Sequence, residues 1–230
     1  SDLKPIIANE IDDWAGDTYS YNHPNTNLLR NDIRNINWNS IVDKNTTHEI
    51  DGIIGGPPCQ GFSLSGNRDP HDPRNSLFME FVKCLKHFRP KFFVMENVPG
   101  ILSMRTAQGK SVIEIILFEC ELAGFKATYS ILNAATYGVP QLRERVFIIG
   151  LKKEFPYSKF NLFPSPEIKN VEDYITVDMA ISDLPEIEAG EGEDFVDYSS
   201  ITQNAYQEWA RRGSNGVYNH VAMRHTKRLI

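Results

Sequence analysis

One cysteine in this sequence stands in a setting suited to nucleophilic chemistry. Cys59 lies in the segment GGPPCQGFS, directly after a short apolar run at residues 52–54. Two glycines allow close approach of another group and two prolines stiffen the turn, so a rigid loop carries the thiol. A donor-rich, exposed setting favours the reactive thiolate. The pattern predicts a catalytic Cys59, whereas Cys84 and Cys120 lie on apolar helical stripes and are predicted to pack in the core.

A carboxylate and an amide occupy a similar place one strand later. Glu96 and Asn97 follow the apolar run at residues 92–95. In open α/β sheets, ligands bind at the carboxyl ends of the strands, so we expect Glu96 to face the same crevice as Cys59. A carboxyl group placed there can donate a proton or a hydrogen bond to a ring nitrogen. A capping carboxylate without a chemical role is the alternative.

A third segment, YGVPQLRER, carries two arginines. Arg143 and Arg145 are two residues apart, so on an extended chain their side chains point to one face. Paired guanidinium groups can hold a phosphate, a carboxylate or a carbonyl oxygen in a defined geometry. Without the other segments, such a pair would be interpreted as a surface pair.

The elements that must position these residues follow an α/β alternation. Short β-rich runs occur at residues 4–10, 28–33, 52–55 and 91–96. Apolar residues recur at helical spacing across residues 77–88 and 112–122, which predicts two helices that cover the sheet. Two further β-rich runs, at residues 127–132 and 145–151, have no helical pattern between them. We expect an antiparallel pair at the sheet edge.

Composition sets broad limits on the class of protein. The 230 residues are 41% hydrophobic, enough for one substantial core. The sequence shows no apolar stretch of membrane-spanning length and no signal-peptide pattern, so we expect neither and take the cytoplasm as the default location. Its three cysteines lack zinc-ligand spacing, so no metal is expected. A formal charge of −6 argues mildly against a nucleic-acid partner.

The pattern changes after about residue 151. Periodicity weakens, prolines become frequent, and an acidic run spans residues 186–194. We therefore expect a catalytic core at residues 1–151 and an exposed extension at residues 152–230.

The segments PPCQ, ENV and QLRER, in this order and spacing, resemble three signature motifs of the cytosine-C5 DNA methyltransferases. Weaker matches lie at Asn9-Glu10, Asn31-Asp32 and residues 74–78, and residues 177–185 and 219–228 resemble stretches of bacterial members. The resemblance implies a Rossmann-like S-adenosylmethionine-dependent methyltransferase fold, with a mostly parallel sheet and an antiparallel edge hairpin.

The resemblance also implies a chemistry for each motif. The Cys59 thiolate would add to cytosine C6 and make C5 nucleophilic. Glu96 would hold and protonate ring N3, while Arg145, with Arg143 near it, would contact the base oxygen or stabilise the adduct. The target cytosine must leave the double helix to reach such a site. The residues that would contact the DNA substrate are Gln60, Ser63, Asn97, Val98 and Gln141.

The methyl donor implied by the resemblance is S-adenosylmethionine, with S-adenosylhomocysteine as the product and no metal. Glu10 would bind the ribose hydroxyls, and Asp32 would take the adenine amino group. The other residues expected at the cofactor are Ile11, Ile33, Pro58 and Leu77.

Two regions of the family pattern are expected outside these residues. The Gly-rich first motif should precede residue 1, and a target-recognition domain should follow residue 230. We therefore expect this segment alone to be inactive or very weak. The expected partners are double-stranded DNA with a flipped cytosine, in the bacterial nucleoid, and a cognate restriction endonuclease.

Three other functions remain open from the sequence. A tRNA cytosine-C5 methyltransferase uses the same residue types on RNA. A non-catalytic DNA-binding homologue would not need Cys59, Glu96 and Arg145 together. A cysteine hydrolase would need a histidine base near the thiol, and the nearest in sequence, His71, has no motif that marks it as one.

Overall fold

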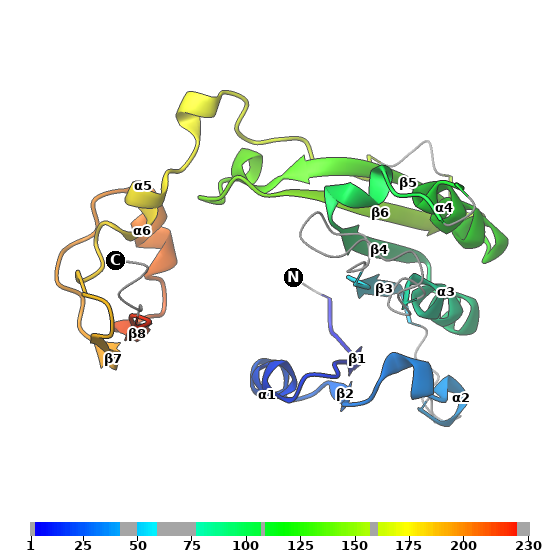
Figure 1. Cartoon of the computed structure of the whole chain (residues 1–230), viewed down its shortest axis with the longest axis horizontal. Coiled ribbons are helices and arrows are strands. Elements are labelled where there is room, and N and C mark those ends of the chain that lie inside the picture. Colours follow the sequence, from blue (N-terminus) through cyan, green and yellow to red (C-terminus); the bar gives the residue numbers. More distant parts are fainter. Residues whose placement is uncertain (1–2, 42–49, 59–76, 107–108, 157–160, 225–230) are drawn as a thin grey trace. The chain divides into compact units, whose positions relative to one another are not determined.

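The computed structural model describes residues 3–41, 50–58, 77–106, 109–156 and 161–224. Contacts divide the chain into two compact units (Figure 1): unit 1 comprises Ser1–Ile131 with Arg145–Phe163, and unit 2 comprises Leu132–Glu144 with Pro164–Ile230. The predicted boundary between residues 151 and 152 stays a prediction. None of the helices in the described ranges combines the length and apolarity that a membrane crossing requires.

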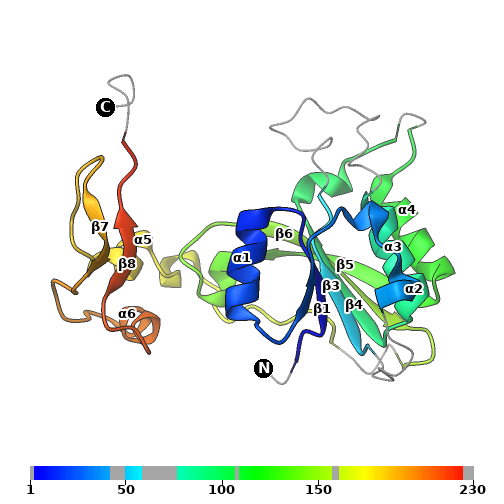
Figure 2. The same cartoon turned by 90° about the horizontal axis from the view of Figure 1, so that it is seen from below.

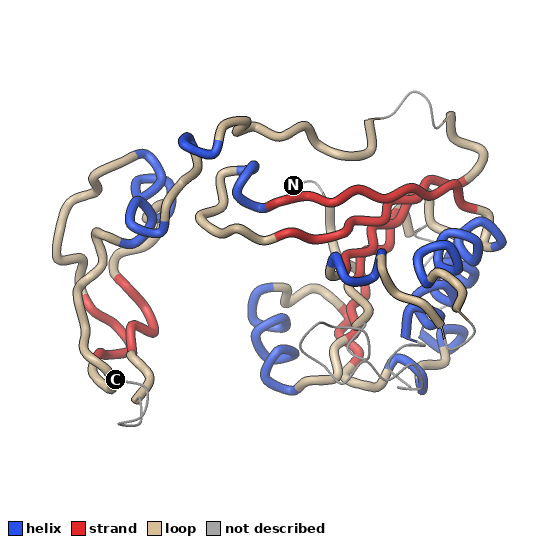
Figure 3. Tube along the Cα trace, turned by 45° about the horizontal axis from the view of Figure 1, so that its top comes forward, coloured by secondary structure: helices blue, strands red, loops and turns tan. Residues whose placement is uncertain are grey.

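A four-stranded sheet runs through unit 1. Its strands, in spatial order, are β3 (Gly52–Gly55), β4 (Phe92–Asn97), β6 (Glu144–Lys152) and β5 (Phe125–Asn133). The β3 and β4 strands are parallel, and β4 and β6 are antiparallel, so this sheet is mixed. Strand β5 lies beside β6 at the edge of the sheet (Figure 3), which confirms the predicted pair of edge strands.

Two helices cover one face of this sheet. Helix α3 (Leu77–Phe88) and helix α4 (Val112–Leu122) match the ranges predicted from apolar periodicity. They lie side by side along the strands (Figure 2). The buried cluster joins both helices to β4, β5 and β6, and each large apolar side chain withdrawn from water contributes roughly 1.5–3 kcal/mol.

Aromatic rings fill the centre of this core. The Phe93 ring meets Phe81 edge-on at 5.8 Å and Phe125 at 5.4 Å between ring centroids. Cys84 and Cys120 are 6% and 0% exposed, and burial raises the pKa of each thiol to about 12. The prediction that these two cysteines pack in the core is confirmed.

A separate two-stranded parallel sheet lies near the start of the chain. Strands β1 (Ile7–Asn9) and β2 (Asn27–Leu29) are shorter than the predicted runs at residues 4–10 and 28–33. Asn9 Nδ2 donates to the carbonyls of Leu29 (2.9 Å) and Asn31 (2.7 Å), which ties the two strand ends together. The connecting helix α1 (Asp13–Asn22) was not predicted.

Short helices complete the described structure. Helix α2 spans Trp38–Ile41. Turns of 3-10 helix occur at Ile33–Asn35, Pro99–Leu102, Ala134–Tyr137 and Val171–Asp173.

Unit 2 contains regular elements in the region predicted as an extension. They are α5 (Val177–Ile181), β7 (Gly192–Val196), α6 (Ala205–Ala210) and β8 (Val217–Val221). The acidic run is exposed, as predicted, but its end forms β7, which pairs with β8 in an antiparallel ladder. Local periodicity gives no sign of this pairing, because the partner strand lies far along the sequence.

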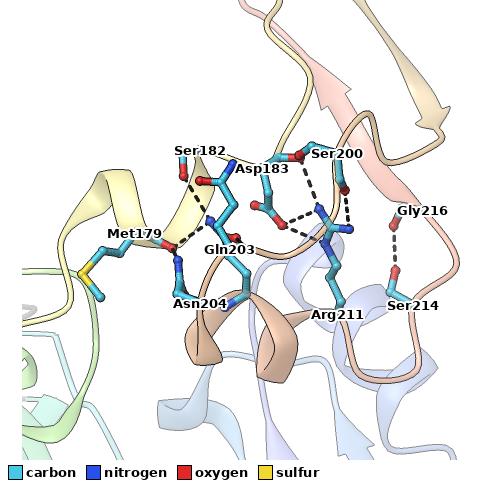
Figure 4. Close-up of polar contacts among 10 residues, drawn as sticks. Met179, Ser182, Asp183, Ser200, Gln203, Asn204, Arg211, Ser214 and Gly216 are labelled. Atoms are coloured by element: carbon cyan, nitrogen blue, oxygen red, sulfur yellow. Dashed lines mark hydrogen bonds and ion pairs between the residues drawn. The ribbon is translucent and has the colours of Figure 1, made fainter.

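Buried polar contacts hold α5 and α6 together. Gln207 is 1% exposed; its Nε2 donates to the Met179 carbonyl at 3.0 Å, and its Oε1 accepts from the Gln203 amide at 2.7 Å. Arg211 Nε donates to Asp183 Oδ2 at 2.7 Å, and the Asp183 side chain is only 4% exposed (Figure 4). Because a buried charge without its partner is costly, these contacts hold unit 2 in one arrangement.

Candidate active site

The carboxyl ends of β3 and β4 meet at one edge of the sheet. The parallel register pairs Gly55 with Met95, so the turn after β3 lies beside the end of β4. Asn97 Nδ2 donates to the Pro57 carbonyl at 3.0 Å, and Asn97 Oδ1 accepts from the Val98 amide at 2.9 Å. Asn97 is 5% exposed, so both bonds lie largely out of water, where an unsatisfied amide would be costly. The Pro57 turn is thereby anchored to β4.

Glu96 and Arg145 form an ion pair on the other face of β4. Met95 and Asn97 point into the buried side, and the alternation of a strand turns Glu96 away from it. Glu96 is paired with Phe147 in the ladder, which places Arg145 on the diagonal. Arg145 Nε lies 2.9 Å from Glu96 Oε1, and the side chains remain 22% and 39% exposed, respectively. The pair is therefore ordered and still accessible to a ligand.

Gly56 lies against the second oxygen of the same carboxylate. A Cβ placed on Gly56 would be 3.2 Å from Glu96 Oε2, closer than most side-chain contacts. The Gly-Gly pair before the two prolines indicates a close approach, but the group that approaches is visible only in the structure. Glycine is needed here because it leaves room for the carboxylate, three residues before Cys59.

The predicted nucleophile and two of its neighbours cannot be placed. Cys59, Gln60 and Ser63 lie outside the described residues. Pro58, the last described residue of the turn, is exposed. The structure therefore positions the turn up to the residue before Cys59.

The ends of β1 and β2 bring two predicted cofactor residues into one region. Glu10 follows β1 and Asp32 follows β2, and the parallel pairing of Asn9 with Leu29 aligns these ends. Glu10 Oε1 accepts from the amides of Ile11 (2.8 Å) and Asp12 (3.0 Å). Its Oε2 accepts no hydrogen bond among the described residues. Half of this carboxylate is thus held by the backbone, and the other half is available to a ligand.

Asp32 has a partner that the sequence analysis missed. Arg34 Nε donates to both carboxylate oxygens of Asp32, at 2.9 Å and 3.0 Å, and the Arg34 amide also donates to Oδ1 at 2.9 Å. These hydrogen bonds lower the pKa of Asp32 to about 2. Asp32 is therefore ionised, and a ligand that uses this carboxylate must share it with Arg34.

The other predicted site residues are spread over both units. In unit 1, Leu77 begins α3 and Val98 precedes the turn at Pro99–Leu102; both are half-buried. Gln141 and Arg143 are exposed and belong to unit 2. The structure brings Glu96 and Arg145 together, whereas the predicted partnership of Arg143 with Arg145 stays a prediction.

Of the other two residues predicted at the cofactor, Ile11 is 66% exposed and Ile33 is half-buried at the start of a 3-10 turn. Within the described ranges, no group of three or more His, Cys, Asp or Glu side chains could hold a metal ion.

Comparison with known proteins places these features in a family context. The family model for C-5 cytosine-specific DNA methylase matches residues 2–228. The type II methyltransferase M.DdeI of Desulfomicrobium norvegicum is 54% identical over 225 residues, covering 98% of this chain and 54% of the relative. M.FnuDI of Fusobacterium nucleatum is 43% identical over 162 residues, or 70% of this chain and 44% of the relative. The chain thus spans about half the length of these curated relatives.

Solved structures show the same fold. A crystal structure described as a candidate DNA modification methyltransferase from an E. coli prophage superposes with a TM-score of 0.73 at 27% identity, covering 96% of this chain and 66% of that one. A Spodoptera frugiperda DNMT2 mutant superposes with a TM-score of 0.57 at 24% identity, covering 82% and 54%, and this likeness supports the fold alone.

Proposed function

The chain belongs to the C-5 cytosine-specific DNA methylase family, and from this premise we propose that it transfers a methyl group from S-adenosylmethionine to C5 of cytosine in double-stranded DNA. The observation that carries the proposal is the Glu96–Arg145 pair, 2.9 Å apart beside the anchored turn that leads to Cys59. A carboxylate near the end of β4 and a guanidinium near the start of β6 suit the two polar edges of a pyrimidine ring.

Cys59 is the nucleophile of the proposed reaction. Its thiolate adds to C6 of the flipped cytosine while Glu96, acting as the acid, delivers a proton to N3, so that electron density moves to C5. C5 would then take the methyl group as S-adenosylhomocysteine leaves. A base removes the C5 proton, the C6–S bond breaks to release the thiolate, and N3 returns its proton to Glu96. Asn97 supports this step by holding the Pro57 turn.

Arg145 orients Glu96, and its guanidinium is the proposed contact to the base oxygen. One of its nitrogens is engaged by Glu96 Oε1. A guanidinium presents several donors in a rigid plane, so it can hold the carboxyl group and stabilise charge that develops on the ring at once. Arg143 is proposed as a second contact to the same substrate.

The residues after β1 fit the proposed methyl donor. Glu10 has an oxygen without a partner among the described residues, and it suits a ribose diol. Asp32, shared with Arg34, suits an exocyclic amino group, with Ile11, Ile33, Pro58 and Leu77 as apolar neighbours. When bound, S-adenosylmethionine supplies an electrophilic methyl group, and no residue here requires a metal.

DNA is the proposed substrate because the matching family model is that of a C-5 cytosine-specific DNA methylase. The target cytosine would flip out of the duplex to reach the carboxyl ends of β3 and β4. Gln60, Ser63, Val98 and Gln141 are proposed as substrate contacts, and a cognate restriction endonuclease as a functional partner. Such a substrate would place the protein at the nucleoid.

Methyl transfer to defined acceptors tests the proposal. Duplex DNA and tRNA are each incubated with the full-length protein and S-adenosylmethionine carrying a labelled methyl group, and the products are digested to nucleosides. We expect label in 5-methyldeoxycytidine, and none with Cys59→Ala. Label in 5-methylcytidine of tRNA alone would replace DNA by RNA as the substrate, and no label in either would contradict the enzyme assignment.

A further inference from the structure

An open cavity of about 410 Å³ lies at the start of helix α4, on residues that the proposed reaction does not use. It is lined by Arg105, Lys110, Ser111, Glu114 and Phe118, with Ile115 beside them. Two cations and one carboxylate give its wall a net positive charge.

Both cations of this cavity lack acidic partners within the described part of the chain. Arg105 Nη1 donates to the Met104 carbonyl at 3.0 Å. Lys110 uses its backbone amide to reach Thr106 Oγ1 at 3.2 Å, and its ammonium group forms no ion pair with a described residue. Many other cations of unit 1 form ion pairs, such as Lys83 with Glu80 at 2.8 Å. At this cavity, two cations without an acidic partner among the described residues lie together.

Ser111 adds a buried hydroxyl that makes no hydrogen bond with a described residue. It precedes α4 as the N-cap residue, yet its side chain makes no capping hydrogen bond, and it is only 8% exposed. Serine at this position ordinarily accepts from an amide of the first turn. A buried polar group without a hydrogen bond is destabilising unless a ligand satisfies it. Ser111 lines the cavity, so a ligand there could accept a hydrogen bond from its hydroxyl.

The helix itself offers further donors at the same place. The Val112 amide bonds to the Met104 carbonyl at 3.2 Å, and the Ile115 amide bonds to Ser111 at 3.1 Å. The amides between them, of Ile113 and Glu114, make no hydrogen bond with a described residue. Free amides and the positive end of the helix dipole favour an anion.

We propose that this cavity binds a backbone phosphate of the nucleic-acid substrate, through Arg105, Lys110, the Ser111 hydroxyl and the free amides of α4. The proposal rests on the proposed function for the identity of the substrate. Phe118 is 57% exposed and forms an apolar wall with Ile115, which suits the sugar of a nucleotide better than a bare anion. Glu114 opposes the anion and weakens the site.

Salt dependence of DNA binding tests the two cations. Binding of a fluorescent cytosine-containing duplex is measured by anisotropy across a series of salt concentrations for the parent, Arg105→Gln and Lys110→Gln. Losing one phosphate contact reduces the slope of log K against log salt by about 0.9. Lys83→Gln, which removes the same charge from a paired surface site, should leave the slope unchanged. Equal slopes for parent, Arg105→Gln and Lys110→Gln would overturn the proposal.

Two further variants separate binding from folding. Ser111→Ala should weaken DNA binding severalfold without lowering Tm, because the hydroxyl caps nothing. Glu114→Gln should strengthen binding, an effect that damage to the fold cannot produce. Weaker binding by Glu114→Gln, or a loss of Tm in Ser111→Ala that matches its loss of binding, would overturn the proposal.

Titration with inorganic phosphate tests whether the cavity binds a free anion or a phosphate of the DNA backbone. If phosphate alone shifts the Glu114 amide resonance while duplex DNA does not, the cavity is a free-anion site and the proposal is overturned. The proposed function fails separately: a parent protein that shows the expected slopes but transfers no methyl group keeps this site and loses the reaction.

Discussion

At the scale of single residues, the arrangement of Glu96 decides what the site can do. Its Oε1 is held by Arg145, and its Oε2 lies against Gly56. The carboxylate is thus positioned by a residue of β6 and by the turn after β3. An acid held beside the anchored Pro57 turn suits the proposed proton delivery to a ring nitrogen, because the geometry must be in place before the reaction.

We expect Glu96→Gln to lower the rate of methyl transfer about 10²- to 10⁴-fold, since the amide keeps the shape but cannot supply the proton. The rate under saturating DNA and S-adenosylmethionine measures this effect. Glu121→Gln, which removes an exposed carboxylate paired with Lys153 on the surface, is the matched control and should retain the parent rate.

Asp32 provides a pH-dependent test of the cofactor region. Its pKa, lowered to about 2 by the Arg34 hydrogen bonds, lies below the value of about 3.9 in an unfolded chain. The pair therefore stabilises the fold above that unfolded value, and the stabilisation is lost as pH falls toward 2. Carboxyl resonances followed by NMR should show Asp32 titrating near 2, and in Arg34→Ala at a higher pH. An unchanged titration in the variant would contradict the pairing.

The three cysteines should differ in reactivity. Burial raises the pKa of Cys84 and Cys120 to about 12, so at pH 8 only about one thiol in 10⁴ is ionised. Brief treatment of the folded protein with iodoacetamide should modify Cys59 and spare the other two, as read by peptide mass spectrometry. Modification of Cys84 or Cys120 as fast as Cys59 would contradict the assignment of their roles.

At the scale of elements, the sequence predicts the helices and strands whose apolar residues recur at a regular spacing. Helices α3 and α4 follow from apolar residues at helical spacing. Helix α1 lacks that pattern because its only buried residue is Gly16, and its start is fixed by the Asp12 side chain, which accepts from the Ala15 amide. Strand β7 has no apolar periodicity, because its five residues are exposed or half-exposed. Its extended conformation is stabilised by pairing with β8.

The candidate site likewise has features that the sequence predicts and contacts that only the structure shows. Strand ends could be located from the sequence, which is why Glu96 was expected at the crevice. The ladder that brings Arg145 to Glu96 and the bond from Asn97 to Pro57 depend on register between distant segments, and no local pattern encodes it. Asn97 uses its amide on the backbone of Pro57 and Val98, and its predicted contact with substrate stays a prediction.

Asn97→Ala should therefore impair both stability and activity. Removal of a buried donor and acceptor leaves the Pro57 carbonyl and Val98 amide without these partners and costs roughly 1–3 kcal/mol in the free energy of unfolding. Urea denaturation measures that loss. Asn133→Ala, which removes a side-chain cap from the turn at Ala134–Tyr137, is a control for loss of an asparagine and should not slow reaction at Cys59. A stable Asn97→Ala protein with full activity would contradict the anchoring role.

At the scale of the whole molecule, the two compact units are stabilised by different kinds of contact. Unit 1 is built on a cluster of aromatic and aliphatic side chains, whereas unit 2 contains buried polar groups such as Gln207 and Asp183. Polar contacts depend on every partner, so unit 2 should be sensitive to single polar substitutions.

Arg211→Ala should destabilise unit 2 by roughly 3–5 kcal/mol, because it leaves the buried Asp183 carboxylate without its guanidinium partner. Hydrogen exchange should show faster opening of α5 and α6 while the sheet of unit 1 keeps its protection. Lys83→Ala, which breaks an exposed pair, should change stability by less than about 1 kcal/mol. Equal effects of the two variants would contradict the polar support of unit 2.

The central claim is that Cys59 attacks a cytosine of DNA in a site organised by Glu96 and Arg145. The most direct measurement is to incubate the full-length protein with S-adenosylmethionine and a duplex containing 5-fluorocytosine, whose fluorine blocks release of the adduct. We predict a protein–DNA complex that survives denaturation and is absent in Cys59→Ala. A folded parent protein that binds the duplex and forms no such complex would contradict the claim.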